Sequence, residues 1–521
     1  MSNGAQALIR TLVDGGVDTC FTNPGTSEIH IVAALDSVPE MRAVLTLFEG
    51  VATGAADGYA RMTGAPAATL LHLGPGLGYG LANLHNARRS KVPVVSIVGD
   101  HATHHAQYDP PLQSDISTIA RNVSDWVRTP RTVQELSRDA AEAIVAALGP
   151  PGQVATLIVP ADVSWQEGAE SAPRLHAAAP PMASAETVET VAKALRGGHR
   201  TALLLGGTAL HGRGLISAAR IAAAAGAKLF AERSTPRLQR GAGLPTVERL
   251  MYWPELAANQ LEGLDRLVLV DAKPPVAWFA YPGAQSTLAP EGCQMHELAP
   301  STSDVVGSLE ALVEALDARE TEPPLQTEAV PPRPYGTLTA AKACQAIGAV
   351  LPEGAIIADE AITSAATLPT QTIGAPRHDW LALTGGAIGQ GLPVAVGAAI
   401  ACPDRPVFAL EADGSAQYTI QSLWTMAREQ LDVTVVIFNN RGYAILDAEL
   451  RRMEASRAGD RARALLDLSA PELDFVKLGS GFGIGSRRVE TAEQLTAALE
   501  RALAEPGPHL IDAVLPAVST S

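Results

Sequence analysis

The chain has few cysteines, and they lie far apart. Among 521 residues there are four, Cys20, Cys293, Cys344 and Cys402, with no pair in a CxxC arrangement. A disulfide scaffold or a zinc cluster requires cysteines at close, regular spacing. We therefore exclude both classes.

Long apolar runs are missing as well. A run such as 93–98 has the length of a strand, and none approaches the ~20 residues that a membrane helix needs. The segment 1–16 lacks the basic region followed by an apolar region that marks a secretory signal. We expect a soluble cytoplasmic protein that does not associate with membranes.

The chain has fewer basic than acidic residues. Lys and Arg number 39 against 55 Asp and Glu, which gives a formal net charge of −16. This balance argues against a protein that coats nucleic acid, although a small anionic substrate responds to local charge alone. Hydrophobic residues make up 47% and charged residues 18%, a composition that predicts large folded cores rather than disorder.

Two proline-rich stretches, 177–184 and 319–336, interrupt the chain and predict linkers. They separate three blocks of domain size, 1–175, 185–318 and 336–521. Each block alternates short apolar runs with longer helical segments. The runs that predict buried strands are 43–48, 67–73, 92–98, 201–207, 227–232, 266–272, 354–360, 407–412 and 433–440. Strands that are apolar on both faces indicate parallel sheets covered by helices, so we expect the α/β class with three doubly wound parallel-sheet domains.

The strongest chemical pattern follows two strands of the third block. Asp413, Gly414 and Ser415 come after one strand, and Asn440 ends the next, 27 residues later. Carboxyl ends of neighbouring parallel strands meet at one edge, where carboxylate and amide oxygens could ligate Mg²⁺. Gly414 permits a tight turn beneath a phosphate, and Ser415 at a helix start can donate to an anion. Either dipeptide alone is typical of an ordinary turn, so the prediction depends on both.

The segments 412–415 (ADGS) and 439–440 (NN) resemble the signature of thiamine-diphosphate (ThDP) enzymes of the acetolactate synthase and benzoylformate decarboxylase type. That family normally has Gly where Ala412 stands. The resemblance implies that Asp413, Asn440 and the backbone carbonyl of Gly442 hold Mg²⁺, which grips the diphosphate. Tyr443 matches a position that lines the pocket.

The resemblance extends to the activating glutamate of the family. Glu49 follows an apolar strand and opens a helix of small residues, 49–63. In the family this carboxyl group bonds to N1′ of the aminopyrimidine, and a raised pKa caused by burial suits that proton sharing. Taken alone, Glu49 would also fit an ordinary first-turn residue stabilised by the helix dipole.

Two further segments match cofactor loops of the family. In 384–393 (TGGAIGQGLP), Gly386 matches the residue whose carbonyl accepts the amino group of the pyrimidine. Ile388 matches the bulky residue that supports the bent cofactor. In 359–364 (DEAITS), Thr363 matches a residue that contacts the diphosphate.

Residues of the first block match the substrate side of the family's site. Thr26 matches a serine that contacts substrate in benzoylformate decarboxylase, Glu28 a structural acid, and His72 a catalytic histidine. A post-strand loop adds His101, His104 and His105. A metal site there is conceivable, but a solvated loop is the better interpretation for at least two of the three.

Some positions depart from the family. Ala280 stands where benzoylformate decarboxylase has its second catalytic histidine, and Glu449 replaces an aromatic residue, which predicts a smaller or more polar pocket. The loop at 203–210 could bind a nucleotide, but a plain strand and turn is the preferred interpretation, so FAD is possible and not favoured. Trp253, Trp278 and Phe279 are expected to be packing residues rather than a flavin platform.

The resemblance implies a ThDP- and Mg²⁺-dependent decarboxylase or carboligase that acts on a 2-oxo acid through a covalent adduct at C2 of the thiazolium. It also implies a homodimer as the minimum, because Glu49 and Asp413 act from different subunits, and a homotetramer is common. The alternatives are a FAD-containing acetolactate synthase chain, an acyl-CoA lyase, and a pseudo-enzyme that only binds ThDP.

Overall fold

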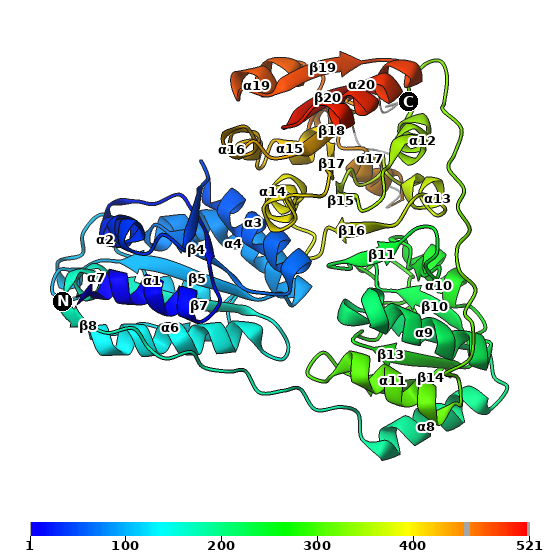
Figure 1. Ribbon diagram of the computed structural model, residues 1–521. Coiled ribbons are helices and arrows are strands. Elements are labelled where there is room, and N and C mark those ends of the chain that lie inside the picture. Colours follow the sequence, from blue (N-terminus) through cyan, green and yellow to red (C-terminus); the bar gives the residue numbers. More distant parts are fainter. Residues whose placement is uncertain (1, 453–458, 518–521) are drawn as a thin grey trace.

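The computed structural model describes residues 2–452 and 459–517. Three sheets built mainly of parallel strands follow one another along the chain, with helices packed on both faces (Figure 1). In the figure the N-terminal unit lies at the left, the middle unit at the lower right and the C-terminal unit at the top. The expected α/β class is confirmed.

The N-terminal sheet contains six parallel strands in the order β3-β2-β4-β5-β7-β6. The strands are β2 (Thr19–Thr22), β3 (Arg42–Leu45), β4 (Ala67–Leu71), β5 (Val94–Asp100), β6 (Trp126–Arg128) and β7 (Val154–Pro160). The helices are α1 (Gly4–Asp14), α2 (Ile29–Ala34), α3 (Glu49–Thr63), α4 (Leu73–Ser90), α5 (Ile116–Ala120), α6 (Val133–Leu148) and α7 (Ala161–Trp165). A short antiparallel pair, β1 (Ser2–Asn3) and β8 (Glu167–Ala169), closes the unit. Every residue of β4 and β7 is buried, as expected for a sheet covered on both faces.

The middle sheet contains five parallel strands in the order β12-β10-β9-β13-β14. The strands are β9 (Thr201–Leu205), β10 (Lys228–Ala231), β12 (Glu248–Arg249), β13 (Arg266–Val270) and β14 (Gln294–Ala299). The helices are α8 (Ala185–Arg196), α9 (Gly212–Ala225), α10 (Pro254–Leu261) and α11 (Val305–Ala315).

The C-terminal sheet has the order β11-β16-β15-β17-β18-β20-β19. Its parallel strands are β15 (Ile356–Glu360), β16 (His378–Ala382), β17 (Val407–Ala412), β18 (Val433–Asn439), β19 (Gly485–Val489) and β20 (His509–Val514). The helices are α12 (Ala340–Val350), α13 (Leu368–Gln371), α14 (Gly391–Ala401), α15 (Asp413–Ala416), α16 (Ser422–Glu429), α17 (Ala444–Arg452), α18 (Asp460–Ala464), α19 (Phe475–Gly481) and α20 (Ala492–Ala504). The remaining strand, β11 (Leu238–Arg240), runs antiparallel to β16 and comes from the middle block.

Two elements differ from the prediction in their bounds. The strand expected over 43–48 ends at Leu45, because residues 46–48 already turn toward α3, with Phe48 as its N-cap. The single helix expected after Asp413 is split into α15 and α16 by residues 417–421.

The N-terminal and C-terminal units meet along α3 and α14, which lie side by side at the centre of Figure 1. Glycines permit the approach of the two helices. A Cβ at Gly58 would lie 2.2 Å from the Val394 carbonyl oxygen, and one at Gly397 would lie 1.9 Å from that of Ala55. This packing fixes α3, which begins at Glu49, against the glycine-rich loop that precedes α14.

Candidate active site

Three loops converge at the carboxyl edge of the C-terminal sheet. They follow β15, β17 and β18, which are neighbours in the sheet. The loop after β15 reaches the loop after β18, because the Asn440 side-chain amide donates to Ser364 Oγ at 3.5 Å. The sheet order thus brings together the segments that the sequence placed at strand ends.

Asp413 and Asn440 offer oxygen atoms at this edge. Asp413 is buried, and its carboxylate accepts from the backbone N–H groups of Gly414 at 2.8 Å and Arg441 at 2.5 Å. Burial raises the pKa of Asp413 to about 6, although these backbone donors oppose the shift. Asn440 Oδ1 accepts from the Gly442 N–H at 3.0 Å. A divalent cation at this edge would favour the ionised form of Asp413.

Gly414 and Ser415, which follow Asp413, are both held by neighbouring side chains. A Cβ at Gly414 would lie 2.5 Å from the ring of Tyr443, so glycine allows this ring to cover the turn. Ser415 Oγ donates to the Glu411 carboxyl group at 2.8 Å. The hydroxyl expected to face a phosphate therefore points to Glu411.

The glycine-rich loop is attached to the N-terminal unit through alternate carbonyl groups. The carbonyl oxygens of residues 385, 387 and 389 accept from His85, Asn86 and Asn83 of α4 at 3.1, 2.8 and 3.1 Å. Gly386, whose φ is +80°, and Ile388 alternate with the bonded positions. The Gly386 carbonyl and the Ile388 side chain therefore remain outside this set of contacts.

Two buried carboxyl groups support the same loop. Glu360 accepts from the N–H groups of Gly389 at 2.7 Å and Gly391 at 2.5 Å. Burial raises the pKa of Glu360 to about 7, and burial together with the neighbouring Glu360 charge raises the pKa of Glu411 well above its usual range. The two carboxyl groups lie close enough for each to affect the pKa of the other. The sequence analysis did not identify either residue; Glu360 could have been found by its place at a strand end, whereas Glu411 lies inside β17.

Glu49 lies at the start of α3 and is 6% exposed. Burial raises its pKa, and opposing contributions come from its own backbone N–H, a hydrogen bond with Asn23 and the nearby His72. The groups that act on Glu49 all belong to the N-terminal unit. Asn23 is a functional candidate that sequence reasoning missed.

His72 is oriented by a buried acid. Glu28 is fully buried; its Oε2 accepts from His72 Nδ1 at 2.8 Å and from the Gly25 N–H at 2.9 Å, and its Oε1 accepts from the Ser27 hydroxyl. Because a carboxylate can only accept, Nδ1 carries a proton and Nε2 is the ring atom left to exchange protons.

The two predicted threonines of the site are both exposed. Thr26 begins the turn 26–28, and Thr363 lies in the loop after β15.

In the middle unit, the Asp271 side chain occupies the space beside the glycine loop at 206–207. A Cβ at Gly207 would lie 1.9 Å from Oδ2 of Asp271, and the Asp271 carboxylate also accepts from Lys91 at 3.0 Å. A carboxylate at this position repels a phosphate. The geometry favours a strand and turn that tie the middle unit to the N-terminal unit.

Aromatic residues of the middle unit approach the cofactor loops. Trp278 is 38% exposed and lies against Gly386, where a Cβ would be 2.8 Å from its ring. Tyr252 lies 5.9 Å from Trp278 between ring centroids. The hydroxyls of Tyr252 and Tyr281 donate to Glu449 of α17 at 3.1 and 2.9 Å. Trp278 packs against the glycine-rich loop and Tyr252, and its role toward a cofactor stays a prediction.

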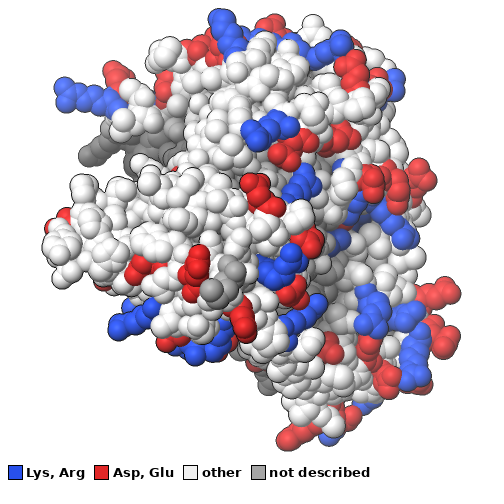
Figure 2. All heavy atoms as spheres, turned by 60° about the vertical axis from the view of Figure 1, so that its left-hand side comes forward, with Lys and Arg blue, Asp and Glu red and all other residues white. Residues whose placement is uncertain are grey.

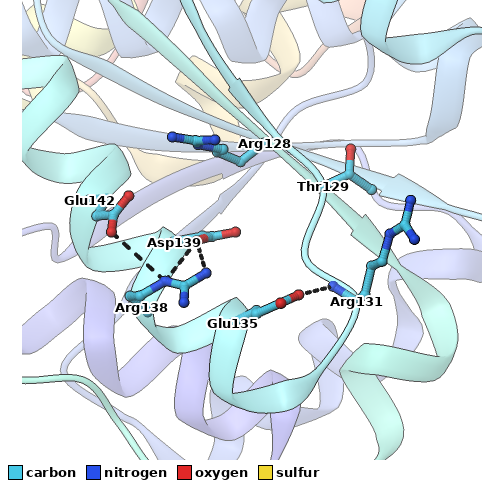
Figure 3. Close-up of a pocket in the computed structure, with 7 residues that line it drawn as sticks. All are labelled: Arg128, Thr129, Arg131, Glu135, Arg138, Asp139 and Glu142. Atoms are coloured by element: carbon cyan, nitrogen blue, oxygen red, sulfur yellow. Dashed lines mark hydrogen bonds and ion pairs between the residues drawn. The ribbon is translucent and has the colours of Figure 1, made fainter.

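A more distant cavity of about 480 Å³ lies beside α6, and Figure 3 shows the residues that line it. Arg138 pairs with Asp139 and Glu142, and the Glu135 carboxylate accepts from the Arg131 backbone N–H. The cavity is lined by as many basic as acidic side chains, and no residue of the cofactor loops lines it.

The histidine loop provides no metal centre. His104 lies 3.9 Å from Asp162, and the rings of His101 and His105 are 5.8 Å apart. Within residues 2–452 and 459–517, no group of three His, Cys, Asp or Glu side chains could hold a metal ion.

One side of the outer surface can be examined for its charge, and the described helices for their ability to cross a membrane. On the side drawn in Figure 2, acidic and basic groups alternate. In the part of the chain that the structure describes, no helix combines the length and the apolar character needed to cross a membrane.

These features define a class of site. Asp413, Asn440 and the Gly442 carbonyl supply oxygen donors of the kind that Mg²⁺ takes together with phosphate oxygens, and Gly386 and Ile388 lie on a fixed loop beside them. This donor set fits a diphosphate cofactor with a divalent cation.

The comparisons identify the family. The model of the thiamine pyrophosphate enzyme N-terminal TPP binding domain matches residues 2–121, and that of the C-terminal TPP binding domain matches residues 364–513. Together they cover more than half of the chain, which belongs to the thiamine pyrophosphate enzyme family.

Several relatives align over nearly the full length. A Mycobacterium tuberculosis protein named "Putative acetolactate synthase large subunit IlvX" is 56% identical, with 99% of each chain covered. The benzoylformate decarboxylase of Pseudomonas aeruginosa is 28% identical, covering 95% of this chain and 96% of that protein. Among solved structures, the thiamine diphosphate-dependent 4-hydroxybenzoylformate decarboxylase of Rhodococcus jostii RHA1 has a TM-score of 0.87 at 25% identity, covering 99% of this chain and all of that one.

Proposed function

We propose that this protein is a ThDP- and Mg²⁺-dependent enzyme that decarboxylates a 2-oxo acid and either releases an aldehyde or joins the product to a second carbonyl compound. One combination carries the proposal. A buried glutamate with a raised pKa, Glu49, occurs in the same chain as the oxygen donors Asp413, Asn440 and Gly442.

When bound, the cofactor supplies a nucleophilic carbon that bonds covalently to the substrate carbonyl and accepts the electrons left as CO₂ departs. Glu49 shares its proton with the pyrimidine ring, for which a raised pKa is suited. Asp413, Asn440 and the Gly442 carbonyl would hold the cation. The Gly386 carbonyl would accept from the pyrimidine amino group, and the Ile388 side chain would support the cofactor from below.

His72 is proposed as the proton carrier at the substrate. Because Glu28 holds Nδ1, the ring presents Nε2 in a fixed direction. Ala280 stands where benzoylformate decarboxylase has its second catalytic histidine, so His72 would serve both proton uptake and proton release. Thr26 is proposed to contact the substrate from the same unit.

Carboligation is supported by the name of the 56% identical relative, and decarboxylation by that of the Pseudomonas protein. A flavin in the middle unit is not favoured, because Asp271 occupies the glycine loop at 206–207. Retention of Glu49 argues against a protein that only binds the cofactor.

The test compares the wild-type protein with Glu49→Gln. We expect both to bind ThDP with Mg²⁺ in isothermal titration, because the diphosphate contacts are unchanged. CO₂ release from a panel of 2-oxo acids should fall at least a hundredfold in the variant, because the amide cannot share a proton in the same way.

Three other outcomes would change the proposal. No ThDP binding by the wild type would remove it. Binding with no CO₂ from any acid would point to an acyl-CoA lyase or a pseudo-enzyme. A yellow purified protein would favour the FAD-containing acetolactate synthase.

A further inference from the structure

Two buried glutamates face each other on the strands that lead into the cofactor loops. In the register of β15 and β17, Glu360 lies directly opposite Glu411. Residues that are opposite each other on neighbouring strands point to the same face of the sheet. A Cβ at Gly391 would lie 2.1 Å from Glu411 Oε1 and 3.2 Å from Glu360 Oε2. Both carboxyl groups therefore meet the same point of the chain.

Glu360 is the member of the pair that holds the glycine-rich loop. Its Oε1 accepts from the N–H of Gly389 at 2.7 Å, and its Oε2 accepts from the N–H of Gly391 at 2.5 Å. On its other side the loop is held through its carbonyl groups by three side chains of α4. The Glu360 carboxyl group thus fixes the loop from within the C-terminal unit, one residue beyond Ile388.

Glu411 is the member of the pair that reaches the segment 413–415. Its Oε2 accepts from the hydroxyl of Ser415, which lies on the short helix that begins at Asp413. Its Oε1 has no hydrogen-bond partner among the residues that the structure describes, and it lies toward Gly391 and Glu360. Burying an ionisable group is unfavourable, so an apolar side chain would be expected at position 411 if filling space were its only role.

A continuous series of contacts therefore joins two parts of the candidate site. It runs from Ser415 through Glu411 and Glu360 to the backbone of the glycine-rich loop, and all of it lies in the C-terminal unit. Buried polar groups in such a series keep their arrangement, because moving one of them leaves another without its partner. The distance between the segment 413–415 and the loop is thus set by side chains as well as by the sheet.

We propose that Glu360 and Glu411 are positioning residues, which hold the glycine-rich loop at the distance from the segment 413–415 that a bent cofactor requires. This inference rests on the proposed function, because that function assigns the diphosphate to the segment 413–415 and the pyrimidine to the loop. In this role neither glutamate touches the cofactor, and each acts through the backbone that does.

Two probes distinguish the loop from the segment 413–415. ThDP would contact both, whereas inorganic pyrophosphate would contact the segment alone, and each is titrated with Mg²⁺ into the full chain. We expect Glu360→Gln to weaken ThDP at least tenfold, because the amide nitrogen cannot accept from a backbone N–H. Pyrophosphate affinity should stay within threefold of the wild type, because Asp413 keeps its own backbone donors.

Substitutions at position 411 test the connection between the two parts. Glu411→Leu removes the acceptor of the Ser415 hydroxyl and should weaken ThDP at least tenfold. Glu411→Gln keeps that acceptor and adds an N–H donor toward Glu360, so ThDP affinity should stay within threefold of the wild type. A residue that only fills space would tolerate leucine at least as well as glutamine.

The double variant tests whether the two glutamates act together. Glu360→Gln combined with Glu411→Leu should bind ThDP within threefold of the weaker single variant, because two breaks in one series of contacts are not additive. Should Glu411→Leu fail to fold, as judged by circular dichroism, Ser415→Ala interrupts the same contact and should weaken ThDP more than pyrophosphate.

The matched control is Glu353→Gln. Glu353 is an exposed residue at the opposite end of β15 from Glu360, and its carboxylate also accepts from a backbone N–H, that of Arg377 at 2.9 Å. The control should bind both probes with wild-type affinity.

Four results would overturn the inference. They are unchanged ThDP affinity in Glu360→Gln, equal losses of ThDP and pyrophosphate in that variant, equal losses in Glu411→Gln and Glu411→Leu, and multiplied losses in the double variant. Failure of the proposed function would show separately, because the wild type would then bind no ThDP.

Discussion

Buried ionisable side chains determine the local chemistry of this protein at the scale of single residues. Glu49, Glu360 and Asp413 each have a raised pKa, and in each case burial is the largest cause. Their partners differ: Glu360 is held by two backbone N–H groups of the glycine-rich loop, whereas Glu49 faces Asn23 and His72. The same residue type thus serves as a loop support in one place and as the candidate activating acid in the other.

A buried histidine outside the site makes the stability depend on pH. His378 is 2% exposed, its Nδ1 donates to the Pro376 carbonyl at 2.8 Å, and burial lowers its pKa to about 4. The unfolded chain, with a pKa of about 6.5, binds more protons than the folded chain between these values. The contribution of His378 to the free energy of unfolding therefore falls by about 2 kcal/mol between pH 7 and pH 5. His211, whose pKa burial also lowers to about 4, acts in the same direction, and Glu360, whose pKa burial raises to about 7, acts in the opposite direction.

Replacing His378 by Asn should remove this one contribution of about 2 kcal/mol, because the amide keeps a donor near the Nδ1 position and does not titrate. Urea unfolding at pH 7 and pH 5 measures the change. His176→Asn, in the exposed linker, is the control and should retain the wild-type dependence. An unchanged slope in His378→Asn would mean that other groups cause it.

At the scale of elements, the packing of α3 against α14 positions the site. A buried ion pair within α3 extends this contact: Arg61 pairs with Asp57 at 2.7 Å and donates to the Ala382 carbonyl at 2.7 Å and to Thr384 at 2.9 Å. The Gln390 amide also donates to Asp57, at 2.5 Å. The helix that begins at Glu49 is thereby attached to the loop that carries Gly386.

Gly58→Ala should break this packing, since the added Cβ would meet the Val394 carbonyl at 2.2 Å. Overpacking of this kind costs about 1–3 kcal/mol of unfolding free energy, measured by urea denaturation. Activity should fall as well, because the glycine-rich loop moves with the helices.

Gly78→Ala is the matched control. Gly78 lies in α4, where nothing is within 4 Å of an added Cβ. The substitution should raise stability by about 0.5–1 kcal/mol, the gain expected for alanine in a helix. Equal effects at the two positions would show that helix propensity, and not the contact of α3 with α14, decides the outcome.

At the scale of the whole molecule, the candidate site is divided between two units. The groups that act on Glu49 come from the N-terminal unit, and those around Asp413 from the C-terminal unit. The middle unit contacts both of the other units. Its Asp271 pairs with Lys91 of the N-terminal unit, and its Tyr252 and Tyr281 donate to Glu449 of α17 in the C-terminal unit. A site completed by a second copy of the chain fits this division.

Mixing two inactive variants tests a shared site. Glu49→Gln and Asp413→Asn each remove one half of every site, whereas a mixed dimer contains one intact site if the halves come from different subunits. After unfolding and refolding an equal mixture, about a quarter of the wild-type CO₂ release should return. Each variant refolded alone is the control. If the mixture contains mixed dimers and still releases no CO₂, Glu49 and Asp413 of one site belong to the same chain.

The sequence by itself determined the α/β class, and it predicted the strand ends at which Asp413 and Asn440 stand and the helix that begins at Glu49, because apolar runs and the polar residues that follow them are local patterns. Tertiary structure decided the rest. β11 joins the third sheet, Glu360 holds the glycine-rich loop, and Arg61 of α3 donates to the Ala382 carbonyl. These features join segments that are far apart in sequence, and burial and pairing between such segments arise only when the sheets pack together.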